Sequence, residues 1–181
     1  MELFKNHKKL GLWLFSKGVD VSKWGTGGAK SVKNLWSELM AGETVLTARP
    51  LHRRVSAVEL FVKRDKKYLI ERKQRLKDGR FRPINRRPRE KLHANENLFK
   101  AVLRCAEEEL GAAPERVRVL SKSSRPKNIY RNSSSYPGLP THYRVYAVRI
   151  KIDGLPGRSF ITREKGRSGP VSEHFWAWGS I

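Results

Sequence analysis

The sequence predicts an α/β fold in which a helical amino-terminal extension precedes a larger domain of strands and one helix. Three observations support this. Residues 55–72 contain two apolar runs separated by polar residues, as in a hairpin, and residues 96–112 carry apolar side chains at helical spacing. Residues 141–152 alternate as a strand does. With 181 residues, of which 38% are hydrophobic, the chain can bury a core, and we place the extension at residues 1–50 and the domain at residues 51–181.

Two helices are expected in the extension. Residues 2–15 mix leucines and aromatic residues with lysines, which suits a first helix. Residues 31–40 suit a second helix, which Gly42 would end. The apolar face of the second helix is formed by Val32, Leu35, Trp36, Leu39 and Met40. So short a segment needs a surface on which to bury Trp13, Trp24 and Trp36. We expect that surface to be the larger domain; the alternative is a partner protein.

The helix expected within residues 96–112 has an apolar face and an acidic end. Its apolar face is formed by Leu98, Ala101, Val102 and Ala106. Gly111 suits the left-handed residue that ends a helix. Glu107, Glu108 and Glu109 lie in the last turn, where the helix dipole disfavours carboxylates. A helix selected for stability alone would carry basic residues there. The glutamates therefore have a purpose other than helix stability, and the alternative is a surface helix with an acidic, solvated end.

The spacing of these residues resembles the Nudix box, G-x5-E-x7-R-E-U-x-E-E-x-G-U, in which U is a bulky apolar residue. The matching residues are Glu96, Arg104, Glu108, Glu109 and Gly111. Cys105 stands where the pattern has a glutamate, and Glu90 stands where it has its first glycine. In that family the carboxylates hold Mg²⁺ or Mn²⁺, hard cations that prefer oxygen ligands to the soft sulfur of cysteine.

The resemblance implies roles for the matching residues. Glu96 and Arg104 would be the residual catalytic pair, and Glu108 and Glu109 the remaining metal-site carboxylates. Because Cys105 replaces a metal-site glutamate, hydrolysis is expected to be impaired.

The resemblance extends beyond the box. Residues 69–72 match the end of the family's opening strands, and residues 174–178 resemble its closing segment. Pro88 matches the proline of a Pro-Gly-Gly turn, but Arg89 and Glu90 replace both glycines. Asn95 also replaces a glycine, and asparagine tolerates left-handed backbone. The implied architecture is a Nudix-like α/β/α sandwich with a mixed sheet, preceded by the short helical extension.

The charge predicts a polyanionic partner. The chain has 39 Lys and Arg against 17 Asp and Glu, a net charge of +22. The charge is densest in residues 72–91 and 121–141, which we expect to be loops. The candidate nucleic-acid-binding residues are Arg80, Arg82, Arg86, Arg87, Arg89, Arg125, Lys127, Tyr130 and Arg131. The alternative is that the basic loops only keep the protein soluble.

Several classes of protein are excluded or disfavoured. No apolar run is long enough for a membrane span, and the first residues lack the pattern of a signal peptide. One cysteine permits no internal disulfide, and no cysteine or histidine has zinc spacing. We therefore expect an intracellular, reducing compartment, and the basic charge suits a mitochondrion or plastid.

Two functions follow from these observations. The first is a Nudix-fold protein that binds RNA or a ribonucleoprotein, has impaired hydrolysis and requires no cofactor. The second is an active hydrolase that uses Mg²⁺ or Mn²⁺ to cleave a nucleoside-diphosphate-linked substrate or an RNA 5′ end. Neither function requires a membrane, and the extension offers a site for a protein partner.

Overall fold

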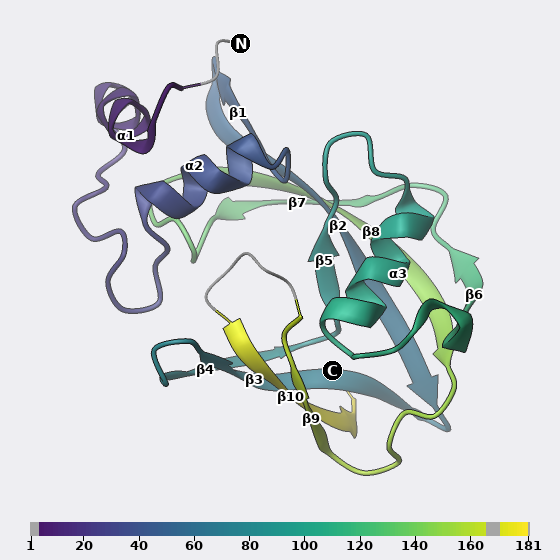
Figure 1. Ribbon diagram of the computed structural model, residues 1–181. Helices are drawn as coiled ribbons and strands as arrows, with labels where there is room; N and C mark the ends of the chain where they lie inside the picture. The colour runs from purple at the N-terminus through teal and green to yellow at the C-terminus, as the bar shows by residue number, and fades with distance from the viewer. Residues whose placement is uncertain (1–3, 166–170, 181) are drawn as a thin grey trace. The chain divides into compact units, whose positions relative to one another are not determined.

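The computed structural model describes residues 4–165 and 171–180, which form ten strands, three α-helices and one 3₁₀ helix (Figure 1). The helices are α1 His7–Ser16, α2 Val32–Met40, α3 Leu98–Glu108 and the 3₁₀ helix Pro114–Arg116. The strands are β1 Val45–Ala48, β2 Leu51–Arg64, β3 Lys67–Leu76, β4 Phe81–Arg86, β5 Arg89–Lys91, β6 Val117–Lys122, β7 Lys127–Asn132, β8 Pro140–Ile152, β9 Phe160–Arg163 and β10 Val171–Gly179. The α/β class is confirmed. No helix among the described residues is long and apolar enough to cross a membrane.

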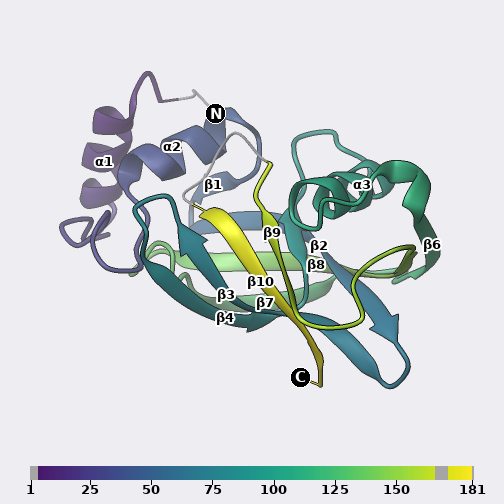
Figure 2. The same ribbon diagram turned by 60° about the horizontal axis from the view of Figure 1, so that its bottom comes forward.

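The strands form a mixed sheet, as the Nudix resemblance implied. Its main order is β6-β8-β2-β3-β10-β9, while β1 and β5 pair with β2, β4 pairs with β3, and β7 pairs with β8. The arrows of the neighbouring strands β2 and β8 point the same way in both views, so this pairing is parallel (Figures 1 and 2). The pairings of β3 with β2, β4 and β10, of β10 with β9, and of β6 with β8 are antiparallel.

The chain folds into two compact units. The first unit comprises Met1–Ser56, Leu92–Asn95 and Lys127–Arg144, and the second comprises Ala57–Lys91, Glu96–Pro126 and Val145–Ile181. The first unit thus contains β1, β7 and the beginnings of β2 and β8 as well as the two amino-terminal helices. The division of the chain into an extension and a domain at residue 50 stays a prediction.

The first unit has its own apolar core, on which α1 and α2 lie side by side (Figure 2). Asn6 caps α1 by accepting a hydrogen bond from the Lys9 amide, and Ser31 caps α2 by accepting one from the Asn34 amide. The expected second helix is therefore confirmed. The first helix begins later than expected, because Asn6 is its cap and residues 4 and 5 precede that cap; residues 2 and 3 lie outside the described part of the chain.

The tryptophans expected to need a surface pack within the first unit. Trp24 lies 5.0 Å from the ring of Tyr136 and donates a hydrogen bond from Nε1 to the Pro137 carbonyl at 3.0 Å. Trp36 donates to the Phe4 carbonyl at 2.9 Å, and Trp13 packs against the core. The fully enclosed part of this core includes Leu10, Leu14, Leu35, Leu46, Tyr136 and Leu139. These rings therefore have an internal packing surface, formed partly by residues 136–139.

In the second unit, β2 and β3 form the expected hairpin, and α3 lies beside β5 (Figure 1). Asn97 caps α3. The buried face of this helix includes Ala101, Val102 and Ala106, as the apolar spacing predicted. Gly111, with a φ of 65°, follows the end of the helix in the left-handed conformation. The strands expected at residues 141–152 and 174–178 are present as β8 and β10.

Two expectations about loops are wrong. Residues 72–91 form the end of β3, the strand β4 and the strand β5, and residues 121–141 contain β7. Among the described residues β4 pairs with β3 alone, and such an edge strand tolerates Pro83 and a row of basic side chains. The segment that matches the family's Pro-Gly-Gly turn, and in which Arg89 and Glu90 replace both glycines, is also a strand, since these two residues pair with Glu59 and Val58 of β2.

Candidate functional site

Arg104, in the middle of α3, is the centre of an ion-pair network in the second unit. Its Nε and Nη2 atoms donate to the two carboxylate oxygens of Glu96 at 3.0 and 2.9 Å. Nη2 also donates to the Lys91 carbonyl at 2.6 Å. A two-pronged arginine–carboxylate pair holds both side chains in one orientation. Glu96 and Arg104, predicted as a residual catalytic pair, thus attach the segment before α3 to the helix.

Two further carboxylates face the same guanidinium. Glu90 Oε1 and Glu108 Oε2 each lie 3.5 Å from Arg104 Nη1. Burial lowers the pKa of Arg104, but the hydrogen bond with Glu96 and the charges of Glu90, Glu96 and Glu108 together raise it above its ordinary value. Arg104 is therefore a permanent cation. It neutralises part of the negative charge at the acidic end of α3.

Cys105 and Glu109 point into the interior. Cys105 is fully enclosed, Glu109 is almost so, and the Cys105 thiol donates to Glu109 Oε2 at 3.9 Å. Burial raises the pKa of the Cys105 thiol, and the negative charges of Glu109 and Glu90 raise it further. Burial also raises the pKa of Glu109, and the negative charges of Glu71 and Glu90 raise it further. Burial therefore favours the neutral form of each group relative to the same group in water.

A buried histidine lies between two carboxylates. His174 of β10 contacts Glu71 Oε1 through Nδ1 at 2.6 Å and Glu164 Oε2 through Nε2 at 2.9 Å. Burial lowers the pKa of His174, but its contacts with Glu164 and Glu71 and the nearby Glu109 raise it to about 10. The ring is therefore an imidazolium at neutral pH, donating from both nitrogens.

Glu71 is held on its other sides as well. Gln74 donates to Glu71 Oε1 at 2.6 Å, and Arg86 Nε lies 3.4 Å from Glu71 Oε2. Burial raises the pKa of Glu71, but the hydrogen bond from His174 and the charges of Arg86 and His174 bring it below its ordinary value. Glu71 and His174 are thus a buried ion pair.

The donor set around the end of α3 does not fit Mg²⁺ or Mn²⁺. These ions take several ionised or carbonyl oxygens in near-octahedral geometry. Here Cys105 is an enclosed thiol in place of a carboxylate, Glu108 faces Arg104, and Glu71 and Glu164 contact His174. Within the described part of the chain, no three His, Cys, Asp or Glu side chains are arranged to hold a metal ion. The positive charge near these carboxylates comes from Arg86, Arg104 and the imidazolium of His174.

Sequence analysis missed Glu71, Gln74, Glu164 and His174. The histidines were considered only for zinc spacing, whereas His174 is 1% exposed and lies between two carboxylates. A usable signal was present. Glu71 follows Leu69 and Ile70 in an apolar strand, and His174 lies in an aromatic one. Each residue is thus a titratable side chain in a strand that is expected to be buried. Because buried carboxylates and histidines need partners, Glu71 and His174 could have been expected to pair with polar groups.

The predicted nucleic-acid-binding arginines of residues 80–89 have partners within the second unit. Arg80 pairs with Asp78 on the surface, and Arg82 donates to Gln74. Arg86 contacts Glu71, while Arg87 and Arg89 both pair with Glu59. Arg87 also stacks over the rings of Phe61 and Tyr68. Contacts with a ligand at these positions would compete with contacts that hold the fold.

The remaining candidate nucleic-acid-binding residues are exposed. Arg125 belongs to the second unit, and Lys127, Tyr130 and Arg131 belong to the first. Tyr130 of β7 is 74% exposed and stacks on His142 of β8, with ring centroids 4.2 Å apart and an interplanar angle of 11°. We call these two rings the Tyr130–His142 stack.

Polar and basic residues surround this stack. His142 Nε2 lies 2.9 Å from Asn128 Oδ1, which fixes the ring. Partial burial lowers the pKa of His142, and the charges of His52, Arg144 and Arg54 lower it further. The ring is therefore neutral at pH 7. Arg131 covers the neighbouring ring of Tyr143, with its guanidinium carbon 5.1 Å from the ring centroid.

The sequence matches no protein-family model and no curated protein with which it was compared. Among solved structures, the chain is similar to a NUDIX hydrolase from Nitrosomonas europaea, with 19% identity and a TM-score of 0.43 over 70% of this chain and 72% of that chain. It is similar to a C. elegans Ap4A hydrolase in a binary complex, with 14% identity and a TM-score of 0.39 over 69% and 79% of the two chains. It is also similar to the E. coli ORF135 protein, with 16% identity and a TM-score of 0.35 over 70% and 74%.

Proposed function

We propose that this chain is a Nudix-like protein that binds single-stranded RNA, free or within a ribonucleoprotein, and has lost metal-dependent hydrolysis. The observation that carries the proposal is the Tyr130–His142 stack, an exposed aromatic surface on a strongly basic protein. Proteins that bind single strands combine aromatic rings, on which bases stack, with cations that contact the phosphates.

The geometry of the stack suits a base. Tyr130 already packs one face on His142, so a base stacking on the exposed part of its ring meets a side chain that has lost much of its freedom. Lys127 and Arg131 are exposed on the same strand, within three residues of Tyr130 in sequence. The net charge of +22 favours any polyanion, and the exposed ring adds a preference for unpaired bases.

The buried cluster supports the loss of hydrolysis. Metal ions in such reactions act as Lewis acids and activate water, which requires ionised ligands. Cys105 offers an enclosed thiol where the Nudix box has a carboxylate, and Glu108 faces the guanidinium of Arg104. His174 compensates Glu71 and Glu164 from inside the fold. The acidic groups are therefore stabilised without a divalent cation.

Replacing Tyr130 by alanine should weaken binding to single-stranded RNA by about 1–3 kcal/mol, because one base loses its stacking partner. Fluorescence anisotropy with a labelled oligonucleotide measures this directly. Tyr130→Phe keeps the ring and should bind nearly as well as wild type. Phe99→Ala removes another exposed aromatic side chain, from α3, and should have no effect.

The same titrations at several salt concentrations test the contribution of charge. The logarithm of the affinity should fall with the logarithm of salt concentration, with a slope of about −0.7 per phosphate neutralised. Charge reversal is best made at the exposed Lys127 and Arg131, since Arg86 contacts the buried Glu71 and its replacement would disturb folding. Equal affinity of Tyr130→Ala and wild type, or binding insensitive to salt, would refute the proposal.

An active hydrolase is the second candidate. Glu90, Glu108, Glu109 and Glu164 lie near one another at the end of α3, where their charges affect each other's pKa values. An enzyme of this kind would require Mg²⁺ or Mn²⁺ to displace the internal cations from these carboxylates. Metal-dependent turnover distinguishes the two candidates.

A further inference from the structure

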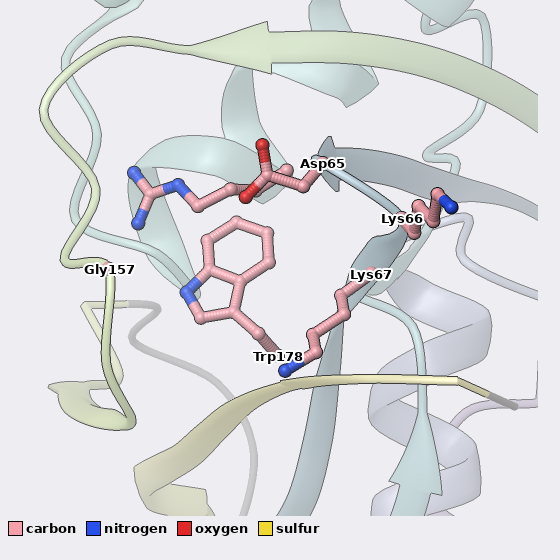
Figure 3. A pocket seen from close by; sticks show the side chains of 6 residues that line it. Asp65, Lys66, Lys67, Gly157 and Trp178 are labelled. Carbon is pink, nitrogen blue, oxygen red and sulfur yellow. The ribbon is translucent and has the colours of Figure 1, made fainter.

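A pocket of about 380 Å³ lies at the turn between β2 and β3, within the second unit (Figure 3). It is lined by Arg64, Asp65, Lys66, Lys67, Gly157 and Trp178. None of these residues belongs to the Nudix box, to the His174 cluster or to the surface around Tyr130. Pockets of roughly 300–1,000 Å³ are the size that small ligands occupy.

The indole and the guanidinium of this pocket are held in place. Trp178 Nε1 donates to the Pro156 carbonyl at 2.9 Å, and Arg64 Nη2 donates to the Leu155 carbonyl at 2.8 Å. The guanidinium carbon of Arg64 lies 4.7 Å from the centroid of the Trp178 ring. A Cβ atom at Gly157 would lie 2.9 Å from Arg64 Nη1, so a glycine makes room for this arrangement. An aromatic surface and a cation are therefore preorganised side by side.

Lysines and one carboxylate complete the pocket. Lys66 and Lys67 are exposed, and neither forms an ion pair among the described residues. Figure 3 shows the Lys67 side chain extending towards Trp178, whereas Lys66 turns outwards. The Asp65 carboxylate also lines the pocket. The pocket thus offers an aromatic ring, the fixed cation of Arg64, the exposed cation of Lys67 and one hydrogen-bond acceptor.

We propose that this pocket binds a nucleotide carrying a terminal phosphate, either a free mononucleotide or the 5′-terminal nucleotide of an RNA. The base stacks on Trp178, and the phosphate, which attracts cations, contacts Arg64 and Lys67. The negative charge of Asp65 repels the phosphate, so the base is the part of the ligand that lies near this carboxylate. Asp65 then accepts a hydrogen bond from an amino group of the base. The pocket is separate from the Tyr130–His142 stack, so this proposal does not depend on RNA binding there.

The test follows the indole N–H signal of Trp178 by ¹⁵N nuclear magnetic resonance in the full chain. The signal is assigned by its loss in Trp178→Phe. Titration with AMP should shift it saturably, whereas adenosine and inorganic phosphate, which each offer half of the recognised chemistry, should bind at least about tenfold more weakly. The absence of a saturable shift with AMP would overturn the proposal.

Two lysine variants separate specific binding from general charge attraction. Lys67→Ala should weaken AMP binding by about tenfold, because one charged contact to the phosphate is lost. Lys63→Ala removes an exposed lysine of the same hairpin that does not line the pocket, and AMP affinity should be unchanged. Equal losses in the two variants would show that only the overall charge matters and would overturn the proposal.

RNA oligonucleotides then distinguish the two sources of the nucleotide. A 5′-phosphorylated oligonucleotide that shifts the Trp178 signal more strongly than its 5′-hydroxyl counterpart assigns the pocket to RNA ends. Equal shifts with the two oligonucleotides, together with saturable AMP binding, assign it to free mononucleotides. Both measurements are repeated in Tyr130→Ala. There the Trp178 response should persist even where overall RNA affinity falls, so that failure of one site is not mistaken for failure of the other.

Discussion

Replacing His174 by alanine should lower the free energy of unfolding by about 3–5 kcal/mol, since removing one partner of a buried ion pair leaves the other charge uncompensated. Glu71 is fully enclosed, and its partners among the described side chains are reduced to Gln74 and the more distant Arg86 once the imidazolium is gone. Urea denaturation at pH 7, followed by circular dichroism, measures the change.

An exposed ion pair of the same unit provides the control. Arg118 lies 3.0 Å from Asp153, and both side chains are more than half exposed. Arg118→Ala should therefore change the unfolding free energy by about 0–1 kcal/mol. A His174→Ala variant as stable as Arg118→Ala would show that His174 does not compensate the buried carboxylates.

The His174 contribution should also depend on pH. In the fold its pKa is raised from the ordinary 6.5 to about 10. The protonated ring is thus favoured by folding, so the stabilisation is fully present below pH 6.5 and is lost as the pH rises through about 10. Between these values, the stability difference between wild type and His174→Ala should shrink by on the order of 1 kcal/mol per pH unit. A difference that stays constant or grows over this range would contradict the assignment of a buried imidazolium.

Replacing Trp24 by alanine should destabilise the first unit by about 3–5 kcal/mol, because a large ring is removed from an enclosed core. Trp24 packs on Tyr136 and donates to the Pro137 carbonyl, so the change removes apolar contacts and a hydrogen bond together. Thermal unfolding followed by circular dichroism measures the loss without relying on tryptophan fluorescence.

Leu12→Ala serves as the control for Trp24. Leu12 is on α1 in the same unit but is 72% exposed, so its removal should change stability by less than about 0.5 kcal/mol. A Trp24→Ala variant with unchanged stability would instead favour the alternative in which the amino-terminal aromatic residues bind a partner protein.

Much of the fold could be predicted where apolar spacing is regular. The pattern over residues 31–40 located α2, and the two apolar runs of residues 55–72 located the hairpin. The strands β4, β5 and β7 were missed because their sequences are dominated by basic and polar residues. β4 pairs with a single neighbour, and at such an edge side chains can stay in water, so burial leaves no alternating pattern in the sequence.

The candidate site was predictable only in its local part. Glu96 and Arg104 are eight residues apart, and the helix cap at Asn97 brings them together. Glu71 and His174 are 103 residues apart and meet only because β3 pairs with β10. No local spacing reveals such a pair. Likewise, Tyr130 was identified by its basic surroundings, but its stacking on His142 depends on the neighbouring strand.

Hydrolysis in the presence of Mg²⁺ and Mn²⁺ tests the loss of Nudix chemistry most directly. The substrates are dinucleoside polyphosphates, nucleotide sugars, coenzyme A, and capped or triphosphorylated RNA, and Glu108→Gln and Glu109→Gln serve as matched controls. With Cys105 enclosed and His174 compensating the carboxylates, we expect no turnover by the wild type above that of either variant. Turnover by the wild type that disappears in Glu108→Gln or Glu109→Gln would contradict this account and identify the chain as an active hydrolase.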